Sequence, residues 1–199
     1  MANQNGQAYG LTILSPIKSG CINSISHDLI IRKYLFHMAK GEDSPFAKVS
    51  GTHFARLVVM NDVVFVGAPT REEHLNSSYL IFTSDFDGGL ENYLETMART
   101  IPDVLDAIWS NCFGYPGAAD ARKFTEYMKK CQVTTTFYFA DVNDKTLGQT
   151  LKALQVKSAL ADFVVQNQGQ PAGALQQAFG AFLAEIEKLP PPKPGAKQF

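Results

Sequence analysis

Four short segments, rich in β-branched and aromatic residues, constrain the fold of this chain more than any other feature. They lie at residues 11–17, 52–60, 78–84 and 133–140. Successive side chains of a strand point to opposite faces of its sheet. When residues 52–60 and 133–140 are divided in this way, each of the two sets contains apolar or aromatic residues. In a sheet with one solvent-exposed face, apolar and polar residues alternate along each strand. Because these segments lack that alternation, we expect both faces of the sheet to be shielded from water.

The segments between and after these strands indicate the fold class. Apolar residues recur at helical spacing at about residues 22–40, 90–112, 118–130 and 147–186. The order of strand, helix, strand, strand, helices and strand is typical of the ferredoxin-like split βαβ unit, an α+β fold with one four-stranded antiparallel sheet. The sequence thus predicts three regions: a ferredoxin-like domain, a C-terminal helical extension and a proline-rich tail, at residues 10–142, 143–189 and 190–199.

The second face of such a sheet needs a cover. Two or three exposed aromatic rings would leave several hundred Å² of apolar surface in water, at about 25 cal/mol per Å². One cover is the sheet of a second subunit, which gives a homodimer of the dimeric α+β barrel type. The other is formed by the C-terminal helices of the same chain. We expect the homodimer, because isologous pairing is the commonest way to close such a unit.

Composition excludes several classes of partner. The 18 Lys and Arg against 19 Asp and Glu give a formal net charge of −1, which argues against a charge-driven nucleic-acid partner. The three cysteines have no short metal-ligand spacing, so we expect free thiols, a cytoplasmic location and no metal site. No apolar run approaches the roughly 18 residues of a membrane span, so we expect no membrane partner. Residues 1–9 are polar and are expected to be loose.

His53 and Arg56 interrupt an otherwise apolar strand. Their spacing of three places them on opposite faces, so both can line one pocket only if a β-bulge shifts the register. Arg56 shares a face with Phe54, where it could hold a ligand carboxylate in an aromatic cavity, or it could pair with Asp85 or Asp87. His53 is either a structural imidazole or a ligand-binding and proton-transfer group.

The two carboxylates Asp85 and Asp87 follow the third predicted strand. Paired acids can transfer protons or bind a hard cation, so we count both, with His53 and Arg56, as candidate catalytic residues. The alternative is structural, because Asp at a strand-to-helix corner is a common turn and cap residue. In that case Asp87 would cap the helix that begins at Leu90.

Three motifs carry a resemblance to known proteins: HFAR at 53–56, FTSDFDG at 82–88 and IWSNCFGYP at 108–116. In these motifs the chain resembles a group of proteins of the dimeric α+β barrel type, over about residues 10–142. That superfamily includes dye-decolourising peroxidases, chlorite-dismutase-like haem proteins and small monooxygenases, so haem is the cofactor that the resemblance suggests. No motif matches the haem-ligand region of those peroxidases, and no catalytic residue is carried over from them.

These observations predict a pocket that binds a small apolar or amphipathic ligand. The resemblance adds haem as an option, with oxidoreductase chemistry of the peroxidase or monooxygenase kind. Arg56 would hold a carboxylate, and His53 would be the axial ligand or proton shuttle. The expected cofactor-binding residues are His53, Arg56, Phe54, Phe82 and Phe137.

The C-terminal helices suggest an alternative function. The apolar stripe from Leu175 to Ile186 and the proline-rich tail could bind a partner, which would make the chain a non-catalytic interaction module. The competing interpretation of the stripe is that it packs on the protein's own domain.

Overall fold

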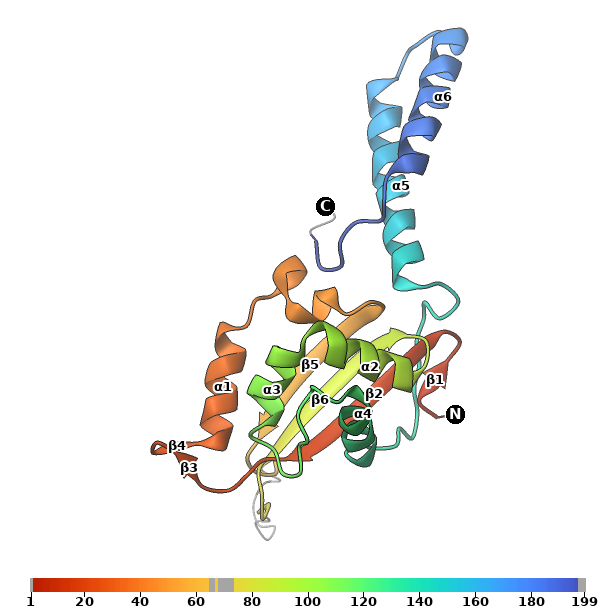
Figure 1. Ribbon diagram of the computed structural model, residues 1–199. Helices are drawn as coiled ribbons and strands as arrows, with labels where there is room; N and C mark the ends of the chain where they lie inside the picture. Colours follow the sequence, from red (N-terminus) through yellow and green to blue (C-terminus); the bar gives the residue numbers. More distant parts are fainter. Residues whose placement is uncertain (1, 65–66, 68–73, 197–199) are drawn as a thin grey trace.

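The computed structural model describes residues 2–64, 67 and 74–196 of the chain. It contains an α+β body and a pair of long helices that projects from that body (Figure 1). The body is built on a four-stranded antiparallel sheet with the order β1-β2-β6-β5. These strands are β1 Gln4–Asn5, β2 Ala8–Pro16, β5 Thr52–Met60 and β6 Tyr79–Asp87. A separate two-stranded hairpin consists of β3 Cys21–Ile22 and β4 Ile25–Ser26.

Three helices cover one face of the sheet, and a fourth lies at its edge (Figure 1). The covering helices are α2 Leu90–Thr100, α3 Pro102–Trp109 and α4 Ala121–Lys130. The edge helix is α1 His27–His37, where Arg32 donates a 2.9 Å hydrogen bond to the Val59 carbonyl of β5. Two short 3-10 turns follow it, η1 Gly41–Asp43 and η2 Pro45–Lys48. The projecting pair is α5 Leu147–Gln166 and α6 Ala172–Lys188.

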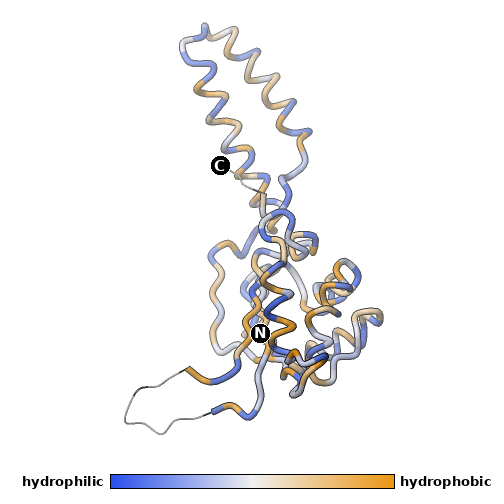
Figure 2. The backbone as a smooth tube through the Cα atoms, turned by 90° about the vertical axis from the view of Figure 1, so that its left-hand side faces the viewer, coloured by the Kyte–Doolittle hydropathy of each residue, from blue (hydrophilic) through white to orange (hydrophobic). Residues whose placement is uncertain are grey.

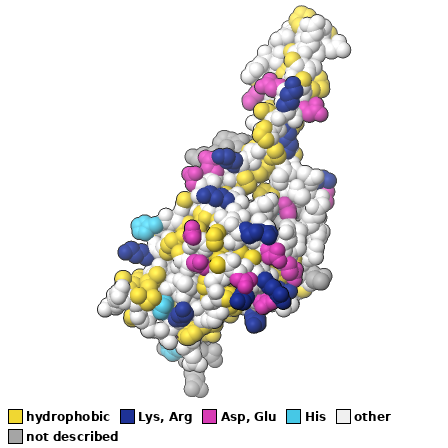
Figure 3. Space-filling view, viewed as in Figure 1, with side chains coloured by type: hydrophobic (Ala, Val, Ile, Leu, Met, Phe, Trp, Pro, Cys, Tyr) yellow, Lys and Arg dark blue, Asp and Glu magenta, His cyan; other side chains and the backbone are white. Residues whose placement is uncertain are grey.

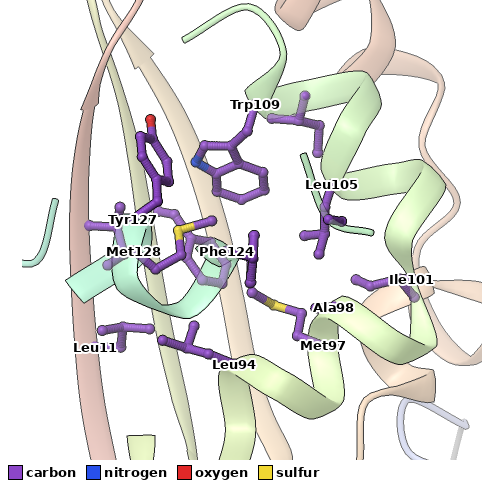
Figure 4. Close-up of a cluster of buried hydrophobic side chains, with 14 of the residues drawn as sticks. Leu11, Leu94, Met97, Ala98, Ile101, Leu105, Trp109, Phe124, Tyr127 and Met128 are labelled. Carbon is purple, nitrogen blue, oxygen red and sulfur yellow. The ribbon is translucent and has the colours of Figure 1, made fainter. Parts of the chain in front are cut away.

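The hydrophobic core lies between the sheet and the covering helices. Figure 4 shows Trp109, Leu105 and Met97 reaching from the helices toward the strands. Trp109 is fully buried, meets the Phe82 ring edge-on at 5.6 Å, and donates its indole N–H to the Ser15 hydroxyl at 3.2 Å. Phe82 therefore lies on the face of the sheet opposite to Arg56 and Phe54, so the predicted set of cofactor-binding residues does not line one site.

The fourth strand of the sheet is not the predicted segment 133–140. That segment leaves the sheet after Gln132 forms a single bridge to Ile13 and the Val133 N–H donates to the Thr12 carbonyl at 2.9 Å. The short strand β1 supplies the fourth strand instead. Residues 2–9 are therefore not loose, because the Asn3 side chain donates 2.9 Å hydrogen bonds to the Gly10 carbonyl and to the Thr135 hydroxyl.

The second face of the sheet is open in this chain, and no described helix lies against it. Two of its apolar side chains, Phe54 and Val58, are 42% and 41% exposed. Residues 133–143 cross one corner, where the Tyr138 ring lies so close to Gly10 that a Cβ there would be 2.6 Å from it. The helices α5 and α6 extend away from the body and leave this face uncovered, so they are not the predicted cover (Figures 1 and 2).

Candidate functional site

A β-bulge in β5 brings the predicted histidine to the open face. Thr52 pairs with Phe86 and Phe54 pairs with Asp85, so His53 is the extra residue on its strand. The His53 Nε2 atom lies 2.7 Å from Asp87 Oδ1, and this ring N–H donates to the carboxylate. Asp87 points away from the core face that Phe86 occupies. Because of the bulge, His53 lies on the same face of the sheet as Arg56. In a regular strand, their spacing of three would place them on opposite faces.

Asp87 joins three segments of the chain. Besides the His53 bond, its Oδ2 accepts a 2.8 Å hydrogen bond from the Leu147 backbone N–H at the start of α5. The predicted role as cap of the next helix is wrong, because Gly89 is the N-cap of α2 and no side chain caps it. Both carboxylate oxygens of Asp87 are thus used to hold the base of α5 and the bulge against β6.

Asp85 has a partner that the sequence did not indicate. The Tyr138 side chain approaches its carboxylate across the corner of the open face, and the polar interaction between the two groups favours the charged form of Asp85. Partial burial raises the pKa of Asp85, and burial together with the negative charge of Asp85 raises the pKa of Tyr138 to about 12. A signal for this contact was present, because Gly10 inside a strand marks a place where another group approaches closely.

Arg56 remains without an ion pair among the described residues. Its guanidinium carbon lies 5.9 Å from the centre of the Phe54 ring, a weak cation–π contact. The alternative pairing with Asp85 or Asp87 is absent from this arrangement. Thr83, which is opposite Arg56 in the register, has a buried hydroxyl with no hydrogen-bond partner in the described part of the chain. Arg56 and Thr83 therefore offer unused hydrogen-bonding groups on one face.

The residues expected to hold a haem do not come together. Phe82 is in the core, and Phe137, on the segment that leaves the sheet, is 82% exposed. The His53 Nε2 atom is bound to Asp87, so only Nδ1 of this ring could ligate an iron. A haem also needs an apolar slot, whereas the face around Phe54 is open. The described residues therefore do not fit a haem with His53 as its axial ligand.

A groove of about 570 Å³ lies elsewhere, between α1, η2 and α3. The helical spacing of Ile30, Tyr34 and Met38 turns one face of α1 toward it. Its apolar wall is completed by Ile25 of β4, Pro45 and Val104. In Figure 3, hydrophobic side chains gather over α1 and the β3–β4 hairpin, with basic side chains beside them. Sequence reasoning missed this groove because it assigned the apolar stripe of α1 to the core and could not place the turns after α1, or Val104 of α3, beside that helix.

The rim of this groove, which we call the α1 groove, is predominantly basic. It carries Lys33, His37 and Lys48 but one carboxylate, Asp43. None of these four side chains forms an ion pair with another residue in the described ranges. Lys33 and His37 are one helical turn apart and therefore lie on the same side of α1. The rim can thus attract an anionic group while the walls contact an apolar one.

Comparisons with known protein families, with curated proteins and with solved structures found no match for this chain. The case for a site therefore depends on geometry, and kinship with the dimeric α+β barrel superfamily stays a prediction. Among the described helices, none is both long enough and apolar enough to cross a membrane. The described residues also contain no group of three or more His, Cys, Asp or Glu side chains that could hold a metal ion.

Proposed function

We propose that this protein binds a small amphipathic anion in the α1 groove. The observation that supports this proposal is an apolar hollow with an unpaired basic rim. Ligand sites of about 300–1,000 Å³ combine mainly apolar walls with a few polar groups that orient the ligand, and the groove volume of about 570 Å³ falls within that range. With two lysines against one acid, and His37 beside them as a hydrogen-bonding group, the rim favours a carboxylate or a sulfonate over a cation.

The apolar body of the ligand supplies most of the affinity. An aromatic ring system that buries roughly 150–250 Å² gains roughly 4–6 kcal/mol, before the entropy of binding is subtracted. Each exposed lysine adds only about 0.2–1 kcal/mol, because water screens its charge. We therefore expect weak binding, in the high micromolar range or above, in which the walls set the affinity and the rim selects the charge.

The experiment compares two ligands with the same ring system. The probes are 1-naphthaleneacetate and its neutral analogue 1-naphthaleneacetamide, titrated into the ¹⁵N-labelled chain and followed by two-dimensional NMR. We expect the anion to bind about 3–10-fold more tightly and to shift the amide signals of α1 and η2. Exchanging Lys33 and Lys48 for Gln should remove that preference, whereas Lys40→Gln, next to the groove, should preserve it. Equal affinities for the two probes, or signal shifts confined to other elements, would contradict the proposal.

The open sheet face is a second candidate for the same ligand class. It is favoured by the unpaired guanidinium of Arg56 beside the unpartnered hydroxyl of Thr83. On this face Arg56 would hold the anion, as the sequence predicts, and Val58 would contact the apolar body. The Arg56→Gln variant separates the two sites. If the preference for the anion is lost in this variant and kept in the lysine double variant, the ligand binds at the sheet.

Pairing of the open face with a second copy stays the proposed cover of the sheet, and it is an alternative to the association through α5 and α6 that is proposed below. It would give the ferredoxin-like homodimer that the strand order predicts, and the exposed Phe54 and Val58 support it. In an isologous pair each subunit would bring the same side chains to the interface. The Val58→Glu variant would place a charge in that interface and should abolish any dimer that uses it.

A further inference from the structure

The outer part of the α5–α6 pair carries no charge. Between Phe163 and Ala184 the sequence contains no Asp, Glu, Lys, Arg or His. The two helices contact each other through three aromatic rings, with the Phe163 ring centre 5.7 Å from that of Phe179 and 5.0 Å from that of Phe182. Two helices alone cannot bury apolar residues that lie on several of their sides. The apolar side chains that remain exposed include Leu160, Val164, Leu175, Phe179 and Leu183.

Two grooves run along the helix pair, one on each flank. The first, of about 570 Å³, is lined by apolar and amide side chains without any charged group, and we call it the uncharged groove. Its walls include Val164, Leu175 and Phe179. The second, of about 450 Å³, carries Asp162 and Glu185 and no basic residue. At 100° per residue, Val164 and Asp162 are well separated around α5, which places the grooves on different flanks.

We propose that the uncharged groove binds the same groove of a second copy of this chain, so that two helix pairs form a four-helix bundle. An isologous contact brings a surface against itself. Contact through the other groove would therefore place Asp162 and Glu185 against their own copies, with no basic partner in that groove. Contact through the uncharged groove has no such cost, and it buries the exposed Val164 and Leu175.

The amide side chains at the rim support a second copy over other occupants. Gln168, Gln170 and Gln176 line the uncharged groove near the tip of the helix pair. An amide both donates and accepts hydrogen bonds, so a surface rimmed with amides is complementary to itself. In a lipid bilayer the same groups would lose their water without gaining partners, at a cost of several kcal/mol each. The chemistry of the rim thus fits a protein surface of its own kind.

The size of the surface predicts a reversible dimer. A helix of 17 residues, the length of α6, spans about 25 Å, and two helices side by side are about 20 Å wide. Each copy would then bury at most about 500 Å², so the interface totals about 1,000 Å², which is below the roughly 1,200–2,000 Å² of stable contacts and typical of transient ones. We expect dissociation in the micromolar range, because area alone does not secure tight binding.

Two neighbouring valines provide a matched test. Val164 lines the uncharged groove and is 53% exposed, whereas Val165 is 68% exposed and lines neither groove. Sedimentation velocity of the full-length chain from about 1 to about 300 μM should show a monomer–dimer equilibrium. Val164→Glu should raise the dissociation constant at least about tenfold, because it buries an unpaired charge. Val165→Glu introduces the same charge one residue away and should leave the dissociation constant within about twofold of the native value.

A folding control and a second interface variant separate loss of the dimer from loss of the helices. Helix content by circular dichroism should be equal in the two valine variants, and Leu183→Glu, on the same flank of α6, gives an independent change in the interface. A native chain that stays monomeric over the whole range, or equal dimer loss in both valine variants, would overturn the proposal. Dimer loss in Val58→Glu with retention in Val164→Glu would assign association to the sheet and also overturn it. Ligand binding in the α1 groove uses other residues and is unaffected by either result.

Discussion

At the scale of single residues, a missing side chain decides where the chain crosses the open face. Gly10 lies in the middle of β2 and leaves room for the Tyr138 ring, which in turn reaches Asp85. Any larger residue at position 10 would occupy the space of that ring. The contact joins two segments that are far apart in the sequence, and it replaces the strand pairing that residues 133–140 were expected to make.

We predict that Gly10→Ala destabilises the protein by about 1–3 kcal/mol, because its Cβ would overlap the Tyr138 ring. Urea unfolding measures this free energy. Combining the change with Tyr138→Ala should remove most of the penalty, since the clash disappears with the ring. The control is Gly173→Ala in α6, where a Cβ would have no atom within 4 Å. An equal penalty with and without the Tyr138 ring would show that the two residues are not coupled.

We also predict that Asp85→Asn stabilises the protein at neutral pH. The native pKa of Asp85 is raised above its ordinary value of 3.8, mainly by burial, so the charged form is disfavoured in the folded state. Stability is therefore lost as the pH rises from 3.8 through the native pKa, and Asn avoids that loss. The gain should stay below about 1 kcal/mol because this half-buried group is screened by water.

Urea unfolding at pH 4 and pH 7 checks this difference. Asp141→Asn, at an exposed position outside the helices, serves as the control for the removal of one negative charge. A gain from Asp85→Asn that is larger at the lower pH would have the wrong sign for a carboxyl group with a raised pKa.

At the scale of elements, the sequence predicts some boundaries and misses others for physical reasons. β5 begins and ends at the predicted residues, 52 and 60, because the run of β-branched and aromatic residues there favours a strand over a helix. The run at 133–140 is at least as rich in such residues. However, β-propensity describes how well a side chain packs on a pleated, half-buried sheet. A segment with high propensity still needs a neighbouring strand whose edge is unpaired. Next to Ala8 and Tyr9 that edge is taken by β1, whose two polar residues give no apolar signal.

The candidate site was predictable only where local pattern determines it. The alternation of the strand placed Arg56 on the same face as Phe54. It also predicted that His53 could share that face only if the strand had a bulge, and the register shift between Thr52 and Phe54 confirms the bulge. It could not supply Tyr138 as the partner of Asp85, because that contact depends on where a distant segment crosses the sheet. The α1 groove was missed because the fold of the turns after α1, which brings Lys48 to the same groove as Lys33, has no local sequence pattern.

We predict that Asp87→Ala loosens the base of α5. The change removes the acceptor of the Leu147 N–H and the partner of His53. Backbone amides at the start of α5 should then exchange with solvent at least about tenfold faster, as expected for the loss of about 1–3 kcal/mol of local stability. Hydrogen–deuterium exchange with mass spectrometry measures this rate. Asp87→Asn retains one acceptor oxygen and should show a smaller effect, and unchanged exchange in Asp87→Ala would refute the anchoring role.

At the scale of the whole molecule, the body holds the core and the helix pair stands outside it. The core cluster of buried hydrophobic residues extends from Tyr9 to Met128 and includes no residue of α5 or α6. The buried residues of the helix pair are Leu151 and Ile186, and its aromatic rings contact one another but stay partly or largely exposed. The body should therefore hold its structure without the helix pair.

We predict that a chain ending at residue 145 folds cooperatively. It keeps the bonds of Asn143 to the N-terminal segment, including the 2.7 Å bond from its side chain to Asn5. The single tryptophan, Trp109, is fully buried in the core and reports on the fold through its fluorescence. Its emission should match that of the full-length chain before urea is added and should shift in one transition. A red-shifted emission in the absence of urea would show that the helix pair is needed for folding.

The helix pair is fastened to the body at two places. One is the bond from Leu147 to Asp87, and the other is the return of the tail, where Gly195 packs so closely that a Cβ would lie 2.5 Å from the Gly41 carbonyl carbon. Both attachments lie at the base of the helix pair, one at the start of α5 and one after the end of α6, so neither serves alone as a free hinge. A dye placed near its tip should accordingly lose fluorescence anisotropy at the tumbling rate of the entire particle, without the fast component of a swinging arm.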